Sequence, residues 1–210
     1  MSVAALVLFV LYLGLEFGLR TWIQWRRTGD TGFRGVSGRP GTAQWWAGVL
    51  FAVALVAGAL GPIAALLGLS PLAALTSPGI QVAGILLTLV GVVATVVTQL
   101  EMGANWRIGV DEAERTDLVT SGGFSAVRNP IFTAMAITGF GLALMVPNLV
   151  ALTGAGLLLI ALQLQVRVVE EPYLLRTHGA AYTGYAEATG RFLPGIGRLT
   201  APVHKLEETS

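Results

Sequence analysis

Five apolar stretches dominate the sequence and constrain its fold more than any other feature. They cover residues 3–19, 45–69, 80–100, 130–146 and 149–166. A helix needs about 20 apolar residues to cross the hydrocarbon core of a bilayer, within a range of about 17–25. Only 12% of all residues are charged, against about 25% in soluble domains. The sequence therefore predicts an all-α integral membrane bundle of about five transmembrane helices.

The thirteen basic residues predict how this bundle is oriented. Five follow the first apolar stretch, three lie between the third and fourth, and five follow the last. The connections at 68–79 and 147–148 carry no charged side chain. With five spans the three basic segments face one side, which the positive-inside rule assigns to the cytoplasm. We therefore expect a multi-pass protein of the inner (plasma) membrane, with its N-terminus outside and its C-terminus in the cytoplasm.

The distribution of polar residues predicts two functional parts. We expect residues 1–100 to form three N-terminal transmembrane helices, with a cytoplasmic loop at 20–44. Residues 101–200 would form the core that carries the chemistry: a cytoplasmic segment, a helical hairpin at 130–166 and a C-terminal cytoplasmic segment. Residues 201–210 are expected to be a disordered tail. No charged residue is expected in the centre of any span, which argues against proton or ion coupling.

Composition excludes several kinds of site. The chain has no cysteine, so disulfides, a cysteine nucleophile and thiolate metal sites are excluded. With only His178 and His204, a histidine-rich metal cage is also excluded, and we expect no metal. The net charge of +1 gives no basic field that would attract nucleic acid. Glycine pairs, Gly14 with Gly18 and Gly139 with Gly141, are expected to allow close contact between helices.

Arg128, Asn129 and Pro130 open the fourth apolar stretch. Proline suits the first position of a helix because its missing N–H would be unpaired there, and asparagine is a common N-cap. One interpretation is a capped helix with an arginine at the membrane edge. The other is an anion site, because helix N-terminal N–H groups and a guanidinium both favour a carboxylate.

Glu170 and Glu171 lie just beyond the fifth apolar stretch. Arg167 and Glu171 are four residues apart and can pair along a helix, which would make this a solvated helix end. Two acids so close to lipid are costly unless paired or hydrated, so they could instead bind hydroxyl groups or an ammonium of a ligand. Pro172 is expected to bend or end the helix. His178 is expected to be structural or solvent-exposed rather than a general base.

Five short motifs follow one another in these polar segments. They read DLVTSGGFSAVRNPIF and, further along, EEPYLLRTHGAAYTGYAEATGRFLP, and they occupy residues 118–124, 128–132, 170–174, 178–185 and 191–194. Together they resemble the pattern of the isoprenylcysteine carboxyl methyltransferase family, in a wider group that includes phospholipid N-methyltransferases. The GxxWRxGV segment at 103–110 resembles bacterial members. Each motif alone is weak, whereas five in this order around a helical hairpin are specific.

The resemblance implies a membrane methyltransferase that uses S-adenosylmethionine without a Rossmann domain. Members of the family hold this cofactor in a cytoplasmic pocket built from the C-terminal helical segments. Carried over to this chain, the residues that would line or support the pocket are Leu118, Val119, Arg128, Asn129, Pro130, Glu170, Glu171 and Tyr182. The candidate catalytic residues, nearest the site of methyl transfer, would be Arg128, Glu170 and Arg191.

This sequence departs from the family pattern at four positions. Phe124 and Phe132 stand where tyrosine is common, and Asp117 and Asn129 stand where the eukaryotic enzymes have histidine. These changes affect the expected substrate more than the adenosine contacts. We expect membrane lipids and a lipophilic or isoprenoid-like small molecule as partners. Carboxyl O-methylation is favoured, because a carboxylate nucleophile needs no base.

Three other functions remain open at this stage. The first is N-methylation of a phospholipid amine. The second is an NADPH-dependent sterol-type reductase, because those membrane enzymes have a related C-terminal arrangement. The third is a transporter or scaffold without chemistry, against which the retained Arg128, Glu170 and Arg191 argue. The oligomeric state is not predicted by the sequence.

Overall fold

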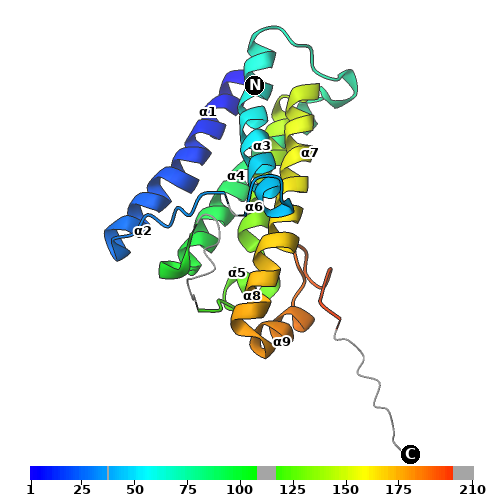
Figure 1. Cartoon of the computed structure of the whole chain (residues 1–210). Helices are drawn as coiled ribbons and strands as arrows, with labels where there is room; N and C mark the ends of the chain where they lie inside the picture. The colour runs from blue at the N-terminus through cyan, green and yellow to red at the C-terminus, as the bar shows by residue number, and fades with distance from the viewer. Residues whose placement is uncertain (37, 108–116, 201–210) are drawn as a thin grey trace, which may run out of the picture.

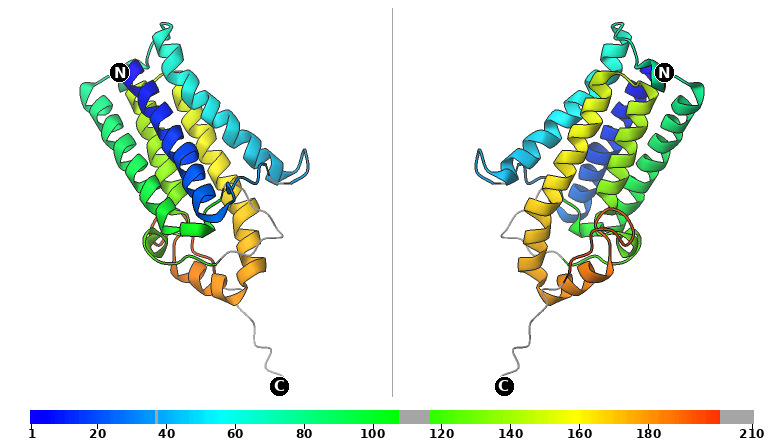
Figure 2. Two further views of the ribbon diagram at one scale, coloured as in Figure 1. Left: turned by 90° about the vertical axis from the view of Figure 1, so that its left-hand side faces the viewer. Right: turned by 90° about the vertical axis from the view of Figure 1, so that its right-hand side faces the viewer.

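The computed structural model describes residues 1–36, 38–107 and 117–200. Figure 1 and Figure 2 show a bundle of long helices with short helices gathered at one end. The helical segments are α1 (Ser2–Leu13), η1 (Gly14–Leu19), α2 (Arg20–Thr28), α3 (Ala43–Leu66), η2 (Ala73–Leu75), α4 (Pro78–Glu101), η3 (Gly103–Asn105), α5 (Gly123–Ala126), α6 (Pro130–Met145), α7 (Leu149–Leu164), η4 (Gln165–Glu170), α8 (Glu171–His178) and α9 (Ala180–Ala188).

In the described part of the chain, four helices are long and apolar enough to cross a membrane. They are Ser2–Thr28, Ala43–Leu66, Pro78–Glu101 and Leu149–His178. A fifth apolar helix, α6, has 16 residues. The prediction of an all-α membrane bundle with about five apolar helices is therefore confirmed.

Side-chain caps set where three of these helices begin. Thr42 accepts a hydrogen bond from the backbone N–H of Trp45 before α3, and Ser77 does the same for Ile80 before α4. Before α7, Asn148 accepts from the Ala151 N–H at 2.9 Å and donates to the Gly61 carbonyl oxygen at 2.8 Å. Each cap satisfies a backbone donor that the first turn of a helix leaves unpaired. The Asn148 contacts also fix the predicted tight connection between α6 and α7 to the end of α3.

The first helix is longer than the sequence predicts. Segments α1, η1 and α2 form one helix from Ser2 to Thr28, and η1 is a π-helical stretch within it. The sequence predicted that this helix ends at residue 19. Gly29, with φ 75°, ends it in the left-handed conformation that glycine adopts without strain. As a result Glu16 and Arg20 lie inside the helix. The expectation that no charged residue lies centrally in a span is wrong for this helix.

The last long helix continues through Pro172. The π-helical segment η4 precedes it, and Pro172 lies in the first turn of α8. Proline in a regular α-helix loses one hydrogen bond and collides with the preceding turn, whereas a π-turn or a first turn accommodates it. Pro172 was expected to bend or end the helix; the end is wrong, since the helix runs from Leu149 to His178, and the bend stays a prediction. Glu170 and Glu171 therefore lie on the helical continuation of α7.

Close helix contacts rest on glycines in the middle of the bundle. A Cβ on Gly141 would lie 2.5 Å from the backbone nitrogen of Thr88, and one on Gly84 would lie 2.8 Å from the Gly141 carbonyl oxygen. These contacts let α4 and α6 approach closely, as predicted for Gly141. Gly14 and Gly18 were predicted to act similarly, but no described atom beyond their own helix backbone and chain neighbours lies within 4 Å of a Cβ built there. That prediction is wrong.

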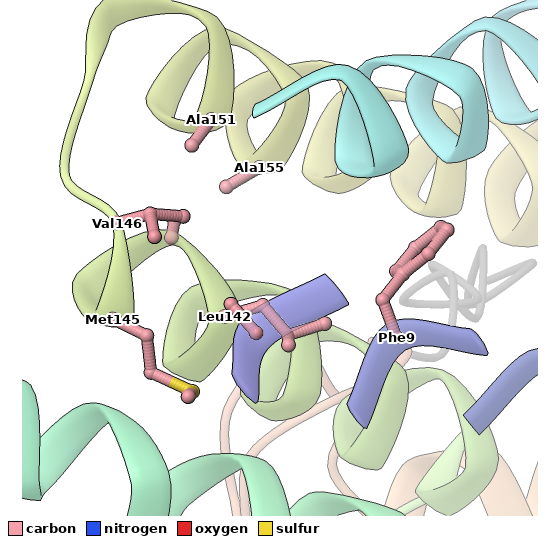
Figure 3. Close-up of a cluster of buried hydrophobic side chains, with 8 residues drawn as sticks. Phe9, Leu142, Met145, Val146, Ala151 and Ala155 are labelled. Carbon is pink, nitrogen blue, oxygen red and sulfur yellow. The ribbon is translucent and has the colours of Figure 1, made fainter. Parts of the chain in front are cut away.

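An apolar cluster holds the bundle together at the end away from the short helices. Figure 3 shows side chains from the first helix, from α6 and from the start of α7 facing one another. They are Phe9, Leu142, Met145, Val146, Ala151 and Ala155, all buried. At the opposite end the first helix, α4 and α8 finish on the same side (Figure 1). The described segments that carry basic residues therefore lie at one end of the bundle, as five alternating helices predict.

Candidate functional site

The chain around Arg128 is tied to the chain around Arg191 by backbone hydrogen bonds. The Arg128 N–H donates to the Gly190 carbonyl oxygen at 2.8 Å, and the Asn129 N–H donates to the Arg191 carbonyl oxygen at 3.1 Å. Val127 and Gly190 form an isolated parallel β-bridge. The second and the last motifs of the sequence are therefore adjacent in the fold.

Asn129 occupies the N-cap position of α6, but its side chain does not cap the helix. Its Nδ2 donates instead to the Arg191 carbonyl oxygen at 3.0 Å. Thr133, one turn into α6, donates from its hydroxyl to the Phe192 carbonyl oxygen at 2.9 Å. The predicted side-chain cap is therefore wrong, because Asn129 holds the segment 191–192 against the start of α6.

Glu171 is the centre of a buried ion-pair network. Its Oε1 accepts from Arg128 Nη2 at 2.7 Å and from Arg191 Nε at 2.8 Å, and its Oε2 accepts from Arg191 Nη2 at 2.9 Å. The side chains of Arg128 and Glu171 are 1% and 8% exposed. Pairing with Glu171 raises the pKa of Arg191, so the network is charged at any physiological pH. Arg167 was predicted to pair with Glu171, but its Nε donates to Gln163 Oε1 at 3.1 Å.

The guanidinium of Arg128 also binds three backbone carbonyls. Nη1 donates to the carbonyl oxygens of Ala186 and Thr189, and Nη2 donates to that of Gly197 at 3.0 Å in addition to Glu171. Both terminal nitrogens are therefore occupied by contacts within the protein. This geometry gives Arg128 the task of joining α8, α9 and the following segment.

A cavity of about 470 Å³ lies between these segments and the helices. Seven of the residues predicted to line or support a cofactor pocket line this cavity: Leu118, Val119, Arg128, Asn129, Pro130, Glu170 and Tyr182. Two other predicted residues, Glu171 and Arg191, are not in its lining and lie in the ion-pair network behind it. The structure therefore places the predicted residues close together but in two layers.

Adjacent glutamates in the EE motif have different surroundings. Glu171 is buried against two arginines, whereas Glu170 is half-buried and lines the cavity. Consecutive residues on a helix point about 100° apart, because an α-helix has 3.6 residues per turn. The same local sequence therefore supplies one carboxylate to the interior and one to the cavity.

Tyr182 and Tyr185 form one wall of the cavity. Their rings meet edge to face with centroids 6.2 Å apart, and the Tyr185 hydroxyl donates to the Phe124 carbonyl oxygen at 2.5 Å. Burial raises the pKa of Tyr185 to about 12 and also raises the pKa of Tyr182, where the charge of Glu171 adds to the effect. Both are neutral phenols at physiological pH, so they can offer ring faces but not an anionic base.

The cavity lining also includes residues that were not predicted as site residues, among them Glu16, Gln99 and Trp106. Glu16 comes from the first helix, Gln99 from the end of α4, and Trp106 from the segment after it. Arg20 lies over the Trp106 ring at 4.7 Å and donates to the Gly103 carbonyl oxygen at 2.6 Å. An acid within an apolar stretch is the signal that could have identified Glu16, because intramembrane ionisable residues commonly serve function.

The remaining predictions concern His178, metal binding and two short segments of the chain. His178 is half-buried at the end of α8 and is not in the cavity lining. Among the residues that the structure describes, no group of three or more histidine, cysteine, aspartate or glutamate side chains could hold a metal ion. The last three residues of the segment 103–110, and the predicted tail 201–210, lie outside the described residues.

Comparison with known proteins adds a reaction class to this geometry. No curated protein and no solved structure matches the chain. The family model for phospholipid methyltransferase matches residues 80–181, from α4 to the beginning of α9. The matched region contains Arg128, the hairpin of α6 and α7, and both glutamates of the EE motif. Residues 80–181 are therefore similar to the phospholipid methyltransferases, a methyltransferase family that covers the isoprenylcysteine carboxyl methyltransferase group.

Proposed function

We propose that the protein is an S-adenosylmethionine-dependent membrane methyltransferase that acts on a lipophilic acceptor. The observation that carries the proposal is the composition of the cavity. Polar residues of the predicted cofactor pocket, such as Asn129 and Glu170, line the same space as Phe51, Leu55 and Leu162 of the apolar helices. A hydrophilic donor and a lipophilic acceptor could therefore meet in it. The family match supports the reaction class.

The residues present fit S-adenosylmethionine in chemistry and in size. A volume of about 470 Å³ lies within the range of about 300–1,000 Å³ typical of small-molecule sites. Leu118, Val119 and Phe124 offer an apolar wall for an adenine ring, and Glu170 offers a carboxylate to ribose hydroxyls or to an ammonium group. When bound, this cofactor supplies a methyl group on a positively charged sulfonium.

The protein's own task in such a reaction is orientation and exclusion of water. Methyl transfer is an in-line displacement, so holding donor and acceptor in line supplies much of the acceleration. In this proposal Glu170 orients the donor, and the tyrosine wall of Tyr182 and Tyr185 closes one side. The network of Arg128, Glu171 and Arg191 then acts by positioning, because it fixes the chain that follows α9 against α8.

A second candidate is N-methylation of a lipid amine. Carboxyl O-methylation was favoured from sequence partly because Arg128 could bind an acidic acceptor. The terminal nitrogens of Arg128 are occupied by Glu171 and backbone carbonyls, which weakens that reason. Two glutamates in the cavity lining, Glu16 and Glu170, suit an acceptor that carries hydrogen-bond donors. Mass spectrometry of the methylated product distinguishes an ester from a methylamine.

Calorimetry on purified protein in lipid nanodiscs tests the proposal. S-adenosylhomocysteine is expected to bind in the micromolar range, which corresponds to about −8 kcal/mol, and NADPH is expected not to bind. NADPH binding without S-adenosylhomocysteine binding would favour the sterol-type reductase. Absence of both would favour a scaffold or transporter.

A further inference from the structure

Glu16 is a buried acid that the proposed cofactor site does not use. The residue is 2% exposed and lies in the π-helical segment η1 of the first helix. Its Oε1 accepts from Gln99 Nε2 at 2.6 Å. Its Oε2 is buried and has no hydrogen-bond partner among the residues that the structure describes. Glu16 lines the cavity of about 470 Å³, so the unused oxygen belongs to a residue that borders an open space.

Neighbouring polar groups do not neutralise this carboxylate. Arg20 follows one turn later, but its terminal nitrogens donate to Gln24 Oε1 and to the carbonyl oxygens of Gln99 and Gly103. The Tyr12 hydroxyl interacts with Glu16, but neither this hydroxyl nor Glu16 Oε2 makes a hydrogen bond of regular geometry in the described chain. A buried oxygen atom that accepts no hydrogen bond, such as Oε2, lowers the stability of the fold. A ligand group that donates to Oε2 would remove this cost.

We propose that Glu16 binds the head group of the methyl acceptor by accepting a hydrogen bond from its N–H or O–H group. Phe17, Phe51 and Leu55 line the same cavity and provide apolar surface for the acceptor's hydrocarbon part. A carboxylate head has no N–H or O–H group to donate to Oε2 and is disfavoured. This inference rests on the proposed function, since it assigns the acceptor side of that cavity.

A purely structural role for Glu16 makes a different prediction. In that case Glu16 only links the first helix to α4 through Gln99. Glu16→Gln keeps the size of the side chain and an oxygen that can accept from Gln99 Nε2. It replaces Oε2 with an amide NH₂ where a donor group of the ligand would bind. The variant protein should then stay stable, while it loses recognition of a head group that donates a hydrogen bond. Glu101→Gln is the matched control, because Glu101 is exposed and is not in the cavity lining.

The test is calorimetry with octylamine, octanol and octanoate on protein in lipid nanodiscs, with and without S-adenosylhomocysteine, after subtraction of heats from empty nanodiscs. The unmodified protein should bind octylamine and octanol at least tenfold more tightly than octanoate. Glu16→Gln should lose at least tenfold in octylamine affinity and keep its affinity for S-adenosylhomocysteine. Glu101→Gln should match the unmodified protein in every titration.

Several results would overturn the inference. The inference fails if octanoate binds most tightly or if no probe binds. It also fails if Glu16→Gln binds octylamine as tightly as the unmodified protein does. The order of the probes in the unmodified protein decides the matter even if the variant does not fold. If the unmodified protein does not bind S-adenosylhomocysteine, the proposed function fails. The relative affinities of the three probes, measured without that ligand, still test the role of Glu16.

Discussion

The guanidinium of Arg128 donates to the carboxylate of Glu171 across 2.7 Å and joins the segment just before α6 to α8. Arg191 binds the same carboxylate with two further hydrogen bonds. The three motifs that contain these residues therefore form one buried charged unit. Glu170, the neighbour of Glu171, is left to line the cavity. Under the proposed function, stability and ligand binding therefore depend on adjacent residues, and substitutions can separate the two.

Glu171→Gln is expected to destabilise the fold strongly. The substitution leaves Arg128 and Arg191 without a balancing charge, and breaking a buried ion pair costs about 3–5 kcal/mol. The melting temperature, followed by size-exclusion chromatography after heating, should fall sharply. Arg128→Ala should act in the same way, because it also leaves carbonyl oxygens of α9 unpaired. An unchanged melting temperature for Glu171→Gln would refute the structural role.

Gly190→Ala is expected to disturb the segment that follows α9. A Cβ at Gly190 would overlap the carbonyl oxygen of Leu193 and lie 2.8 Å from the Gly195 nitrogen. Both neighbours are backbone atoms, so the loop has to shift, and such overpacking costs about 1–3 kcal/mol. Thermal unfolding measures the effect. Gly184→Ala is the control, because no described atom beyond its own helix backbone and chain neighbours lies within 4 Å of a Cβ there, and alanine favours a helix by about 1 kcal/mol. Equal melting temperatures for the two variants would contradict the expectation.

The helical bundle was predictable because lipid-facing helices need long apolar sequences. The stretches 45–69, 80–100 and 149–166 mark observed helices, and the hairpin connection was read from Pro147 and Asn148. Helix ends were less predictable, since the first helix and the last long helix continue through π-helical segments. A π-helical turn leaves no clear signal in hydropathy, because it changes hydrogen bonding and not composition.

The sequence predicted which segments lie together at the candidate site, but not which of their residues face the cavity. Motif order placed Glu170 and Glu171 near Arg128, and the structure brings these segments together. The π-helical segment η4 changes the direction in which the following side chains leave the helix. Tertiary packing sets this direction, and it decides which glutamate faces the cavity. Glu16 was missed because the apolar stretch was expected to end soon after it.

Membrane orientation follows from the shared side of the basic segments and is testable by reporter fusions. Fusions after Leu69 and after Pro147 should report the outside, because the connections at these positions carry no charge and lie away from the basic end. A fusion after Arg39 is the control and should report the cytoplasm. Cytoplasmic signals after both Leu69 and Pro147 would contradict an outside N-terminus.

Glu170→Gln is expected to impair ligand binding without loss of the fold. Glu170 is half-buried in the cavity lining, and its neighbour Glu171 carries the ion pairs with the arginines. A hydrogen bond to a charged group contributes about 1.5–3 kcal/mol, so the affinity for S-adenosylhomocysteine should fall at least tenfold. The melting temperature in the absence of ligand should change little, since the charged unit stays intact. Calorimetry and thermal unfolding on the same preparation measure both quantities.

Glu187→Gln provides the matched control for this comparison. Glu187 lies on α9 and is not among the residues that line the cavity, so removal of its charge should leave the affinity for S-adenosylhomocysteine unchanged. If Glu170→Gln and Glu187→Gln bind this ligand equally well, Glu170 does not contact it. If Glu170→Gln instead unfolds as readily as Glu171→Gln, both glutamates serve the fold, and the cavity would have to bind the cofactor through other residues such as Asn129 and Tyr182.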